Sequence, residues 1–142
     1  MKRLRFAFHA VALCAVTAAL AAKAPITHEQ RWKLTRVGAP EVSPDGRWAV
    51  FPVTLPAYES KDTSTDLWLM PADGSVEPRQ ITFTRGSEGG PAWSPDSSRL
   101  VFSAKREGDD EAQLYLLNMT SSGEAERLTT LSTGAGNAAW SP

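Results

Sequence analysis

The stretches VSPDGRWAVF (Val42–Phe51) and WSPDSSRLVF (Trp93–Phe102) share the letters Ser-Pro-Asp and a closing Val-Phe. The same phrase begins a third time in AAWSP, at Ala138–Pro142. Self-similarity at a fixed spacing is typical of a repeated structural unit, and it has to be found before local patterns are interpreted. The chain is therefore expected to contain copies of one small unit.

The spacing between matching residues gives the length of this unit. The two first stretches are offset by 51 positions, whereas three later pairs are all offset by 47. The later pairs are TDLWLM (65–70) with AQLYLL (112–117), QIT (80–82) with RLT (127–129), and WSP (93–95) with WSP (140–142). Since the offset changes between Phe51 and Leu67, the first unit is expected to carry four additional residues in one loop.

A unit of about 40–50 residues with four short apolar segments is typical of a β-propeller blade. RWAVFPV (47–53) and DLWLM (66–70) are rich in β-branched and aromatic residues, as are RLVFSA (99–104) and QLYLL (113–117). The segments around QIT and RLT carry charge and suit an outer edge. The sequence thus predicts an all-β partial β-propeller, with about two four-stranded blades, the start of a third and a short N-terminal helix.

The Ser-Pro-Asp phrase has the chemistry of a tight turn between two strands. Ser43 and Pro44 suit the first two positions of a type I turn, and Gly46 suits a left-handed residue that leads into the next strand. Ser97 replaces that glycine in the second copy, which is expected to cost about 1 kcal/mol. Asp45 and Asp96 recur with the turn, so a turn role is preferred to metal binding or catalysis.

The N-terminus has the pattern of a secretory signal peptide: a basic start, an apolar run over 10–20 and small residues near Ala21. A short membrane anchor is the alternative, but this run is shorter than the roughly 20 residues that span a bilayer. Cleavage after Ala21 would place the mature protein in the periplasm or outside the cell. The mature chain would then lack a thiol, because the single cysteine is Cys14.

The predicted organisation has three parts: a signal peptide (1–21), a lead-in with the short helix (22–36) and the partial propeller (37–142). In the lead-in, Thr27 and Gln30 form a capping box that predicts a helix over about 28–34, with Trp32 expected to face the propeller. Within the propeller we expect blade one at about 37–83, blade two at about 89–130 and the start of blade three at 136–142.

These phrases resemble the N-terminal propeller of the prolyl oligopeptidase family of serine peptidases, in its dipeptidyl-aminopeptidase or acylaminoacyl-peptidase branch. TolB-like periplasmic propellers use nearly the same W-S-P-D-G phrase, so both readings stay open. Three segments favour the peptidase: LTRVGAPEVSPDG (34–46), YESKDTSTDLWL (58–69) and KREGDDEAQLYLL (105–117). The resemblance covers 27–142.

The resemblance to the peptidases implies a propeller that screens and orients peptides for a C-terminal α/β-hydrolase domain with a Ser-Asp-His triad. The G-x-S-x-G motif of that domain is absent from this sequence, and His28 is the single histidine after residue 21. No catalytic, cofactor-binding or metal residue is therefore assigned to this chain. The implied partners are further blades, the hydrolase domain and, through it, peptides; a TolB-like module would instead bind envelope proteins.

Two surface features complete the expectations. Glu107, Asp109, Asp110 and Glu111 could attract a cation or a substrate amine, but a solvated hairpin tip is preferred. The loops 56–66, 83–90 and 104–112 are expected on one rim, opposite the Ser-Pro-Asp turns, and binding is expected on that rim. The tryptophans of the repeat are assigned to core packing rather than to a sugar platform. A net charge of −1 gives no support for nucleic-acid binding.

A closed propeller has about four to eight blades, so further blades are expected beyond Pro142. Repeat units that bury their faces on neighbours need about three copies to be stable. The chain by itself is therefore expected to fold weakly, or to aggregate through its open blade edge.

Overall fold

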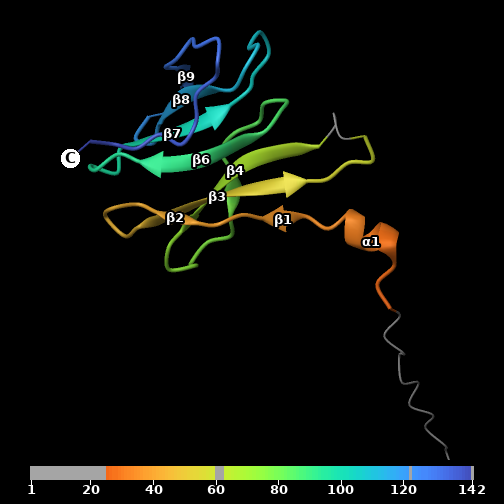
Figure 1. Ribbon diagram of the computed structural model, residues 1–142. Coiled ribbons are helices and arrows are strands. Elements are labelled where there is room, and N and C mark those ends of the chain that lie inside the picture. Colours follow the sequence, from red (N-terminus) through yellow and green to blue (C-terminus); the bar gives the residue numbers. More distant parts are fainter. Residues whose placement is uncertain (1–24, 60–62, 122, 142) are drawn as a thin grey trace, which may run out of the picture.

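The computed structural model describes residues 25–59, 63–121 and 123–141 (Figure 1). The predicted signal peptide at 1–21 lies outside the described residues. Among the residues that are described, no helix is long and apolar enough to cross a membrane.

Two antiparallel sheets make up nearly all of the regular structure, and each is built from consecutive strands. In blade one, β3 pairs with β1, β2 and β4, and β4 pairs with β5; in blade two the order is β6-β7-β8-β9. The elements are α1 (His28–Trp32), β1 (Arg36–Val37), β2 (Glu41–Val42), β3 (Trp48–Leu55), β4 (Ser64–Pro71), β5 (Arg79–Gln80), β6 (Glu88–Trp93), β7 (Arg99–Ala104), β8 (Gln113–Asn118) and β9 (Glu126–Arg127). The predicted all-β fold of two stacked blades is confirmed.

A proline disturbs the pairing of the first strand in each blade. Blade one divides it into β1 and β2 on either side of Pro40, and both pieces pair with β3. Blade two keeps one strand, but its register with β7 shifts between Gly89 and Ala92, around Pro91. Because proline has no backbone N–H, it cannot donate to the ladder at this position in either blade.

The four extra residues of blade one do not lengthen a loop, and that prediction was wrong. β3 and β4 have eight residues each, whereas β7 and β8 have six each. The additional pairs extend the hairpin, with Thr54 opposite Thr65 and their hydroxyls 2.9 Å apart. Threonine fits a pleated strand well, so these residues continue the ladder outward instead of forming a turn.

The Ser-Pro-Asp turns have the predicted geometry in both copies. Gly46 has φ +70° and Ser97 has φ +59°, so the serine adopts the left-handed conformation of the glycine it replaces. In each copy the serine hydroxyl donates to the aspartate at 2.5 Å and accepts the backbone N–H that opens the next strand at 2.9 Å. Asp45 and Asp96 thus serve the turn.

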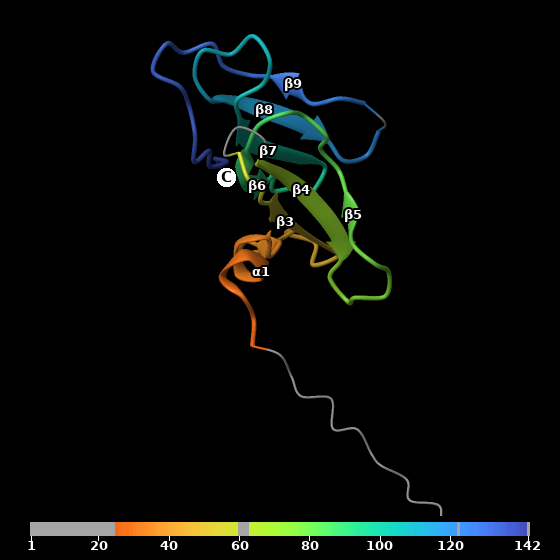
Figure 2. The same cartoon turned by 90° about the vertical axis from the view of Figure 1, so that its right-hand side faces the viewer.

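The core lies between the two sheets (Figure 2). Side chains alternate between the faces of a strand, so one face of blade one contributes Val50, Leu67 and Leu69. The facing surface of blade two contributes Leu100, Phe102, Ala104, Tyr115 and Leu117, and Trp93 of β6 completes the cluster. Phe102 and Tyr115 stack with ring centroids 6.2 Å apart. Core packing is confirmed for Trp93, while Trp48, Trp68 and Trp140 are half-buried.

The lead-in helix has the predicted capping box but not the predicted packing. The Gln30 backbone N–H donates to Thr27 Oγ1 at 3.1 Å, and the Thr27 N–H donates to Gln30 Oε1 at 3.0 Å. No residue of α1 is buried, and Trp32 is 52% exposed. The helix instead contacts the blade-one loop through Tyr58, whose hydroxyl donates to Glu29 Oε1 at 2.6 Å. The polar side chain of Glu29, and not Trp32 as predicted, therefore holds α1 against blade one.

Candidate binding rim

The long loops gather at one end of the blades. β3 begins after one Ser-Pro-Asp turn and β7 begins after the other, and both strands end at a loop of the opposite rim. That rim holds the described loop residues 56–59, 81–87 and 105–112, and the segment 128–137 returns to it after β9 (Figure 1). We call it the loop rim. The arrangement follows from the alternation of antiparallel strands, as the sequence predicted.

The acidic loop of blade two is not a fully solvated tip, and here the expectation was wrong for one residue. Asp109 is only 8% exposed, because its carboxylate turns inward. Tyr115 Oη donates to Asp109 Oδ2 at 2.6 Å, the Arg106 backbone N–H donates to the same oxygen at 3.1 Å, and Arg127 Nη1 lies 3.0 Å from Oδ1. These contacts fix the loop onto β8 and β9.

The same contacts shift two pKa values in opposite directions. The hydrogen bond from Tyr115, followed by that from the Arg106 backbone, lowers the pKa of Asp109 because it favours the charged carboxylate. Burial raises the pKa of Tyr115, and its bond to Asp109 raises it further. At neutral pH the pair is therefore a charged acceptor with a neutral donor, which is a strong form of hydrogen bond.

Arg106 connects this loop to β6, the first strand of blade two. Its guanidinium carbon lies 4.3 Å from the centroid of the Tyr115 ring, and its Nη2 lies 3.6 Å from Glu88 Oε1. Glu88 opens β6 and is 2% exposed. Sequence reasoning missed Glu88 and Arg106, because they lie 18 positions apart and meet only when the loop folds back over β6.

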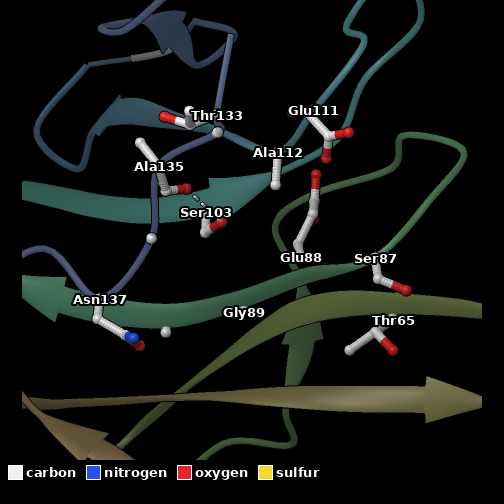
Figure 3. A pocket seen from close by; sticks show the side chains of 13 residues that line it. Thr65, Ser87, Glu88, Gly89, Ser103, Glu111, Ala112, Thr133, Ala135 and Asn137 are labelled. Carbon is white, nitrogen blue, oxygen red and sulfur yellow. Dashed lines mark hydrogen bonds between the residues drawn. The ribbon is translucent and has the colours of Figure 1, made fainter. Parts of the chain in front are cut away.

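Beside Glu88 the loop rim has a hollow of about 590 Å³ (Figure 3). β6, the 105–112 loop and the segment 133–137 form its walls. The last of these is held in place by Ala135, whose N–H donates to the Ala112 carbonyl at 2.7 Å and whose carbonyl accepts from Ser103 Oγ at 3.1 Å. Glu88 and Glu111 are the charged residues of the lining, which contains no lysine or arginine.

The described residues contain no cluster of three His, Cys, Asp or Glu side chains arranged to hold a metal ion. His28 lies in α1, with its ring centroid 6.5 Å from that of Trp32, and it does not line the hollow. The geometry of the described residues defines a class of structure: stacked propeller blades with a loop-bearing rim.

Comparisons with known proteins give more particular relatives. The chain is similar to dipeptidyl-peptidase 5 of Porphyromonas gingivalis, with 35% identity over 83 residues. It is also similar to dipeptidyl-peptidase 5 of Porphyromonas endodontalis, with 27% identity over 105 residues. These matches cover 58% and 74% of the chain but only 12% and 14% of the relatives, so the chain spans about an eighth of their length. No family model matches.

Among solved structures, one assigned as TolB from Agrobacterium tumefaciens matches with a TM-score of 0.49 and 26% sequence identity. The match covers 65% of this chain and 32% of that one.

Proposed function

We propose that this chain is the N-terminal propeller segment of a secreted or periplasmic serine peptidase. In that protein the propeller screens and orients peptides for an α/β-hydrolase domain elsewhere in the same polypeptide. The observation that carries the proposal is the 35% identity over 83 residues to a dipeptidyl-peptidase 5. The chain itself supplies a scaffold and a rim, and the chemistry belongs to the hydrolase domain.

The loop rim supports a screening role in two ways. Its blade-two loop is held by the buried Asp109 and by Arg106, so the loop presents a fixed surface. Its blade-one hairpin extends two residue pairs further than the hairpin of blade two, and it ends at the loop that carries Tyr58. A rigid scaffold with protruding loops is the usual way in which a fold positions a binding surface.

The open faces of the two blades support a larger propeller. On the side of blade one that faces away from blade two, Trp68 and Met70 are only half-buried. On the opposite side of blade two, Leu114 and Leu116 are also half-buried. Blades of a closed ring cover such surfaces, so the proposed partners are neighbouring blades of the same protein.

The test is to express the complete reading frame and to measure release of dipeptides from a chromogenic dipeptidyl reporter. We expect activity that is lost when the serine of a downstream G-x-S-x-G motif is changed to alanine. A frame that closes the ring of blades without that motif, and a product without peptidase activity, would contradict the proposal and favour a TolB-like binding module.

A further inference from the structure

We propose that the connection from blade one to blade two, residues 81–87, is a joint that tightens when Asp66 is neutral and loosens when Asp66 is ionised. The corresponding connection from blade two, residues 128–134, is fastened by Gln113 and lacks this dependence. Asp66 and Gln113 occupy the same place in their repeats, 47 positions apart. The inference concerns the fold of this chain and does not rest on the proposed peptidase function.

Gln113 fastens the blade-two connection through both ends of its amide. Its Oε1 accepts the Thr129 hydroxyl at 2.8 Å and the Leu131 backbone N–H at 3.0 Å. Its Nε2 donates to the Leu131 carbonyl at 2.7 Å. The side chain is buried, so these bonds also satisfy its own polar atoms. Leu131 is thus held by a donor and an acceptor from the same side chain.

The surroundings of the two positions match closely. Thr82 Oγ1 accepts a backbone N–H of β4 at 2.8 Å, and Thr129 Oγ1 accepts one of β8 at 2.9 Å. Gln80 Nε2 donates to the Thr82 carbonyl at 2.8 Å. In blade two, Arg127 Nε donates to the Thr129 carbonyl, also at 2.8 Å. The acidic residue in place of the amide is therefore the main difference between the two connections.

Asp66 leaves the middle of the blade-one connection unfastened. Its side chain is one methylene shorter than that of Gln113, and an ionised carboxylate cannot donate a hydrogen bond. Thr84, the counterpart of Leu131, turns its hydroxyl to Glu88 at 2.6 Å instead. Asp66 is 5% exposed, yet its Oδ1 has no hydrogen-bond partner among the described residues. A buried charged oxygen without a partner costs free energy, so ionisation favours a loosened joint that admits water.

The direction of the pH effect follows from burial. Burial raises the pKa of Asp66, and the side chains of Gln80 and Ser64 offset this rise only in part. An acid whose pKa is raised in the folded state penalises folding above that pKa, and the penalty is absent below its unfolded value of about 4. The joint is therefore tight in acid and loosens as the pH rises.

Charged neighbours do not take over this role. The charged side chains of the adjoining elements are Arg36 of β1, Glu59 of the hairpin loop, Arg79 of β5, Arg85 of the connection and Glu88 of β6. The first four are exposed, and Glu88 has Arg106 at 3.6 Å. Asp66 alternates with the core residue Leu67, so it points away from blade two. Among the described residues, none of these side chains forms an ion pair with Asp66.

The experiment is hydrogen exchange of the full-length protein that carries this chain, followed by mass spectrometry. Exchange is measured at about pH 4 and about pH 7 and corrected for the intrinsic rates. From the lower to the higher pH, we expect residues 82–87 to lose roughly threefold or more of their protection, relative to residues 129–134. Asp66→Asn should abolish this loss, because its amide carries no charge at either pH.

Asp73→Asn is the matched control, because Asp73 is exposed in the β4–β5 loop and should behave like the wild type. Gln113→Asp is the reciprocal variant, and it should give residues 129–134 the pH dependence of residues 82–87. Protection of 82–87 that does not change with pH in the wild type, or a change that persists in Asp66→Asn, would overturn the proposal. Dipeptide release reports on the peptidase proposal separately, so failure of one does not count as failure of the other.

Discussion

The indole N–H of Trp140 donates to the backbone carbonyl of Ala92 at 3.0 Å. One repeat earlier, the indole N–H of Trp93 donates to the carbonyl of Glu41 at 3.1 Å. In both cases the tryptophan of a repeat bonds the first strand of the blade before it. The repeated phrase therefore marks a repeated contact, because its tryptophan bonds the first strand of the preceding sheet in both copies. Blade one has Val42 at this position, and Val42 is 55% exposed.

Trp93→Phe should destabilise the protein by about 1–2 kcal/mol, because it keeps an aromatic ring but leaves the Glu41 carbonyl without its donor. Thermal or denaturant unfolding of the full-length protein measures this. Trp68→Phe is the matched control, since the Trp68 indole makes no hydrogen bond among the described residues. Equal losses for the two variants would mean that the bond between the blades contributes nothing.

Gly46→Ala should destabilise by about 1 kcal/mol through backbone strain, because a left-handed residue other than glycine is unfavourable. The added Cβ itself meets no atom within 4 Å, so sterics with neighbours do not contribute. Ser97→Gly should do the opposite and stabilise by up to about 1 kcal/mol. Part of that gain is offset, since Ser97 Oγ accepts the Asp45 N–H at 3.1 Å. A stabilised Gly46→Ala would contradict the turn assignment.

The turn aspartates predict how stability changes in acid. The Ser94 hydroxyl, followed by the Ser98 hydroxyl, lowers the pKa of Asp96 to about 2. A depressed folded-state pKa adds stability above the unfolded value near 4, and that stability is lost as the pH falls toward about 2. The wild type should therefore lose more stability between about pH 4 and pH 2 than Asp96→Asn does. Equal losses over this window would show that the carboxylate charge is immaterial.

The blade-two loop carries two neighbouring aspartates, of which Asp109 is buried and Asp110 is exposed. Asp109→Asn should lower the melting temperature, because the uncharged amide weakens the contacts with Tyr115 and Arg127. Asp110→Asn should leave it nearly unchanged, since Asp110 is exposed. Differential scanning fluorimetry of the two variants makes the comparison. A similar melting temperature for both would restore the solvated-tip interpretation.

The blade-one hairpin can be shortened to test the screening role. Removing the pairs formed by Thr54, Leu55, Ser64 and Thr65 would give it the strand lengths of the β7–β8 hairpin. In a full-length peptidase we expect kcat/KM on long peptides to rise roughly threefold or more relative to a dipeptidyl reporter, because a barrier at the rim is lowered. An unchanged ratio would argue against screening by this rim.

The sequence predicted the features that depend on local chemistry and on repetition. The strands, the turns with Gly46 and Ser97 and the capping box at Thr27 all follow from short patterns, and the structure confirms them. The rim that carries the long loops could also be predicted, because antiparallel strands alternate in direction.

The remaining features depend on contacts that no short pattern encodes. Asp109 looked like one of four solvated acids, and its burial depends on Tyr115 and Arg127, six and eighteen positions away. Glu88 carries no local signal at all, because its environment comes from a loop that folds back over β6. The sequence predicts the four extra residues in a loop, because a change of offset between repeats does not reveal whether strands can lengthen.

The most direct test of the stacked-blade account is thermal unfolding of the isolated segment 25–142, with its mass measured by light scattering. The account predicts a broad transition or aggregation, because Trp68, Met70, Leu114 and Leu116 lie on faces that neighbouring blades would cover. A sharp, cooperative transition of a monomer would contradict it, because the two sheets would then form a self-sufficient domain.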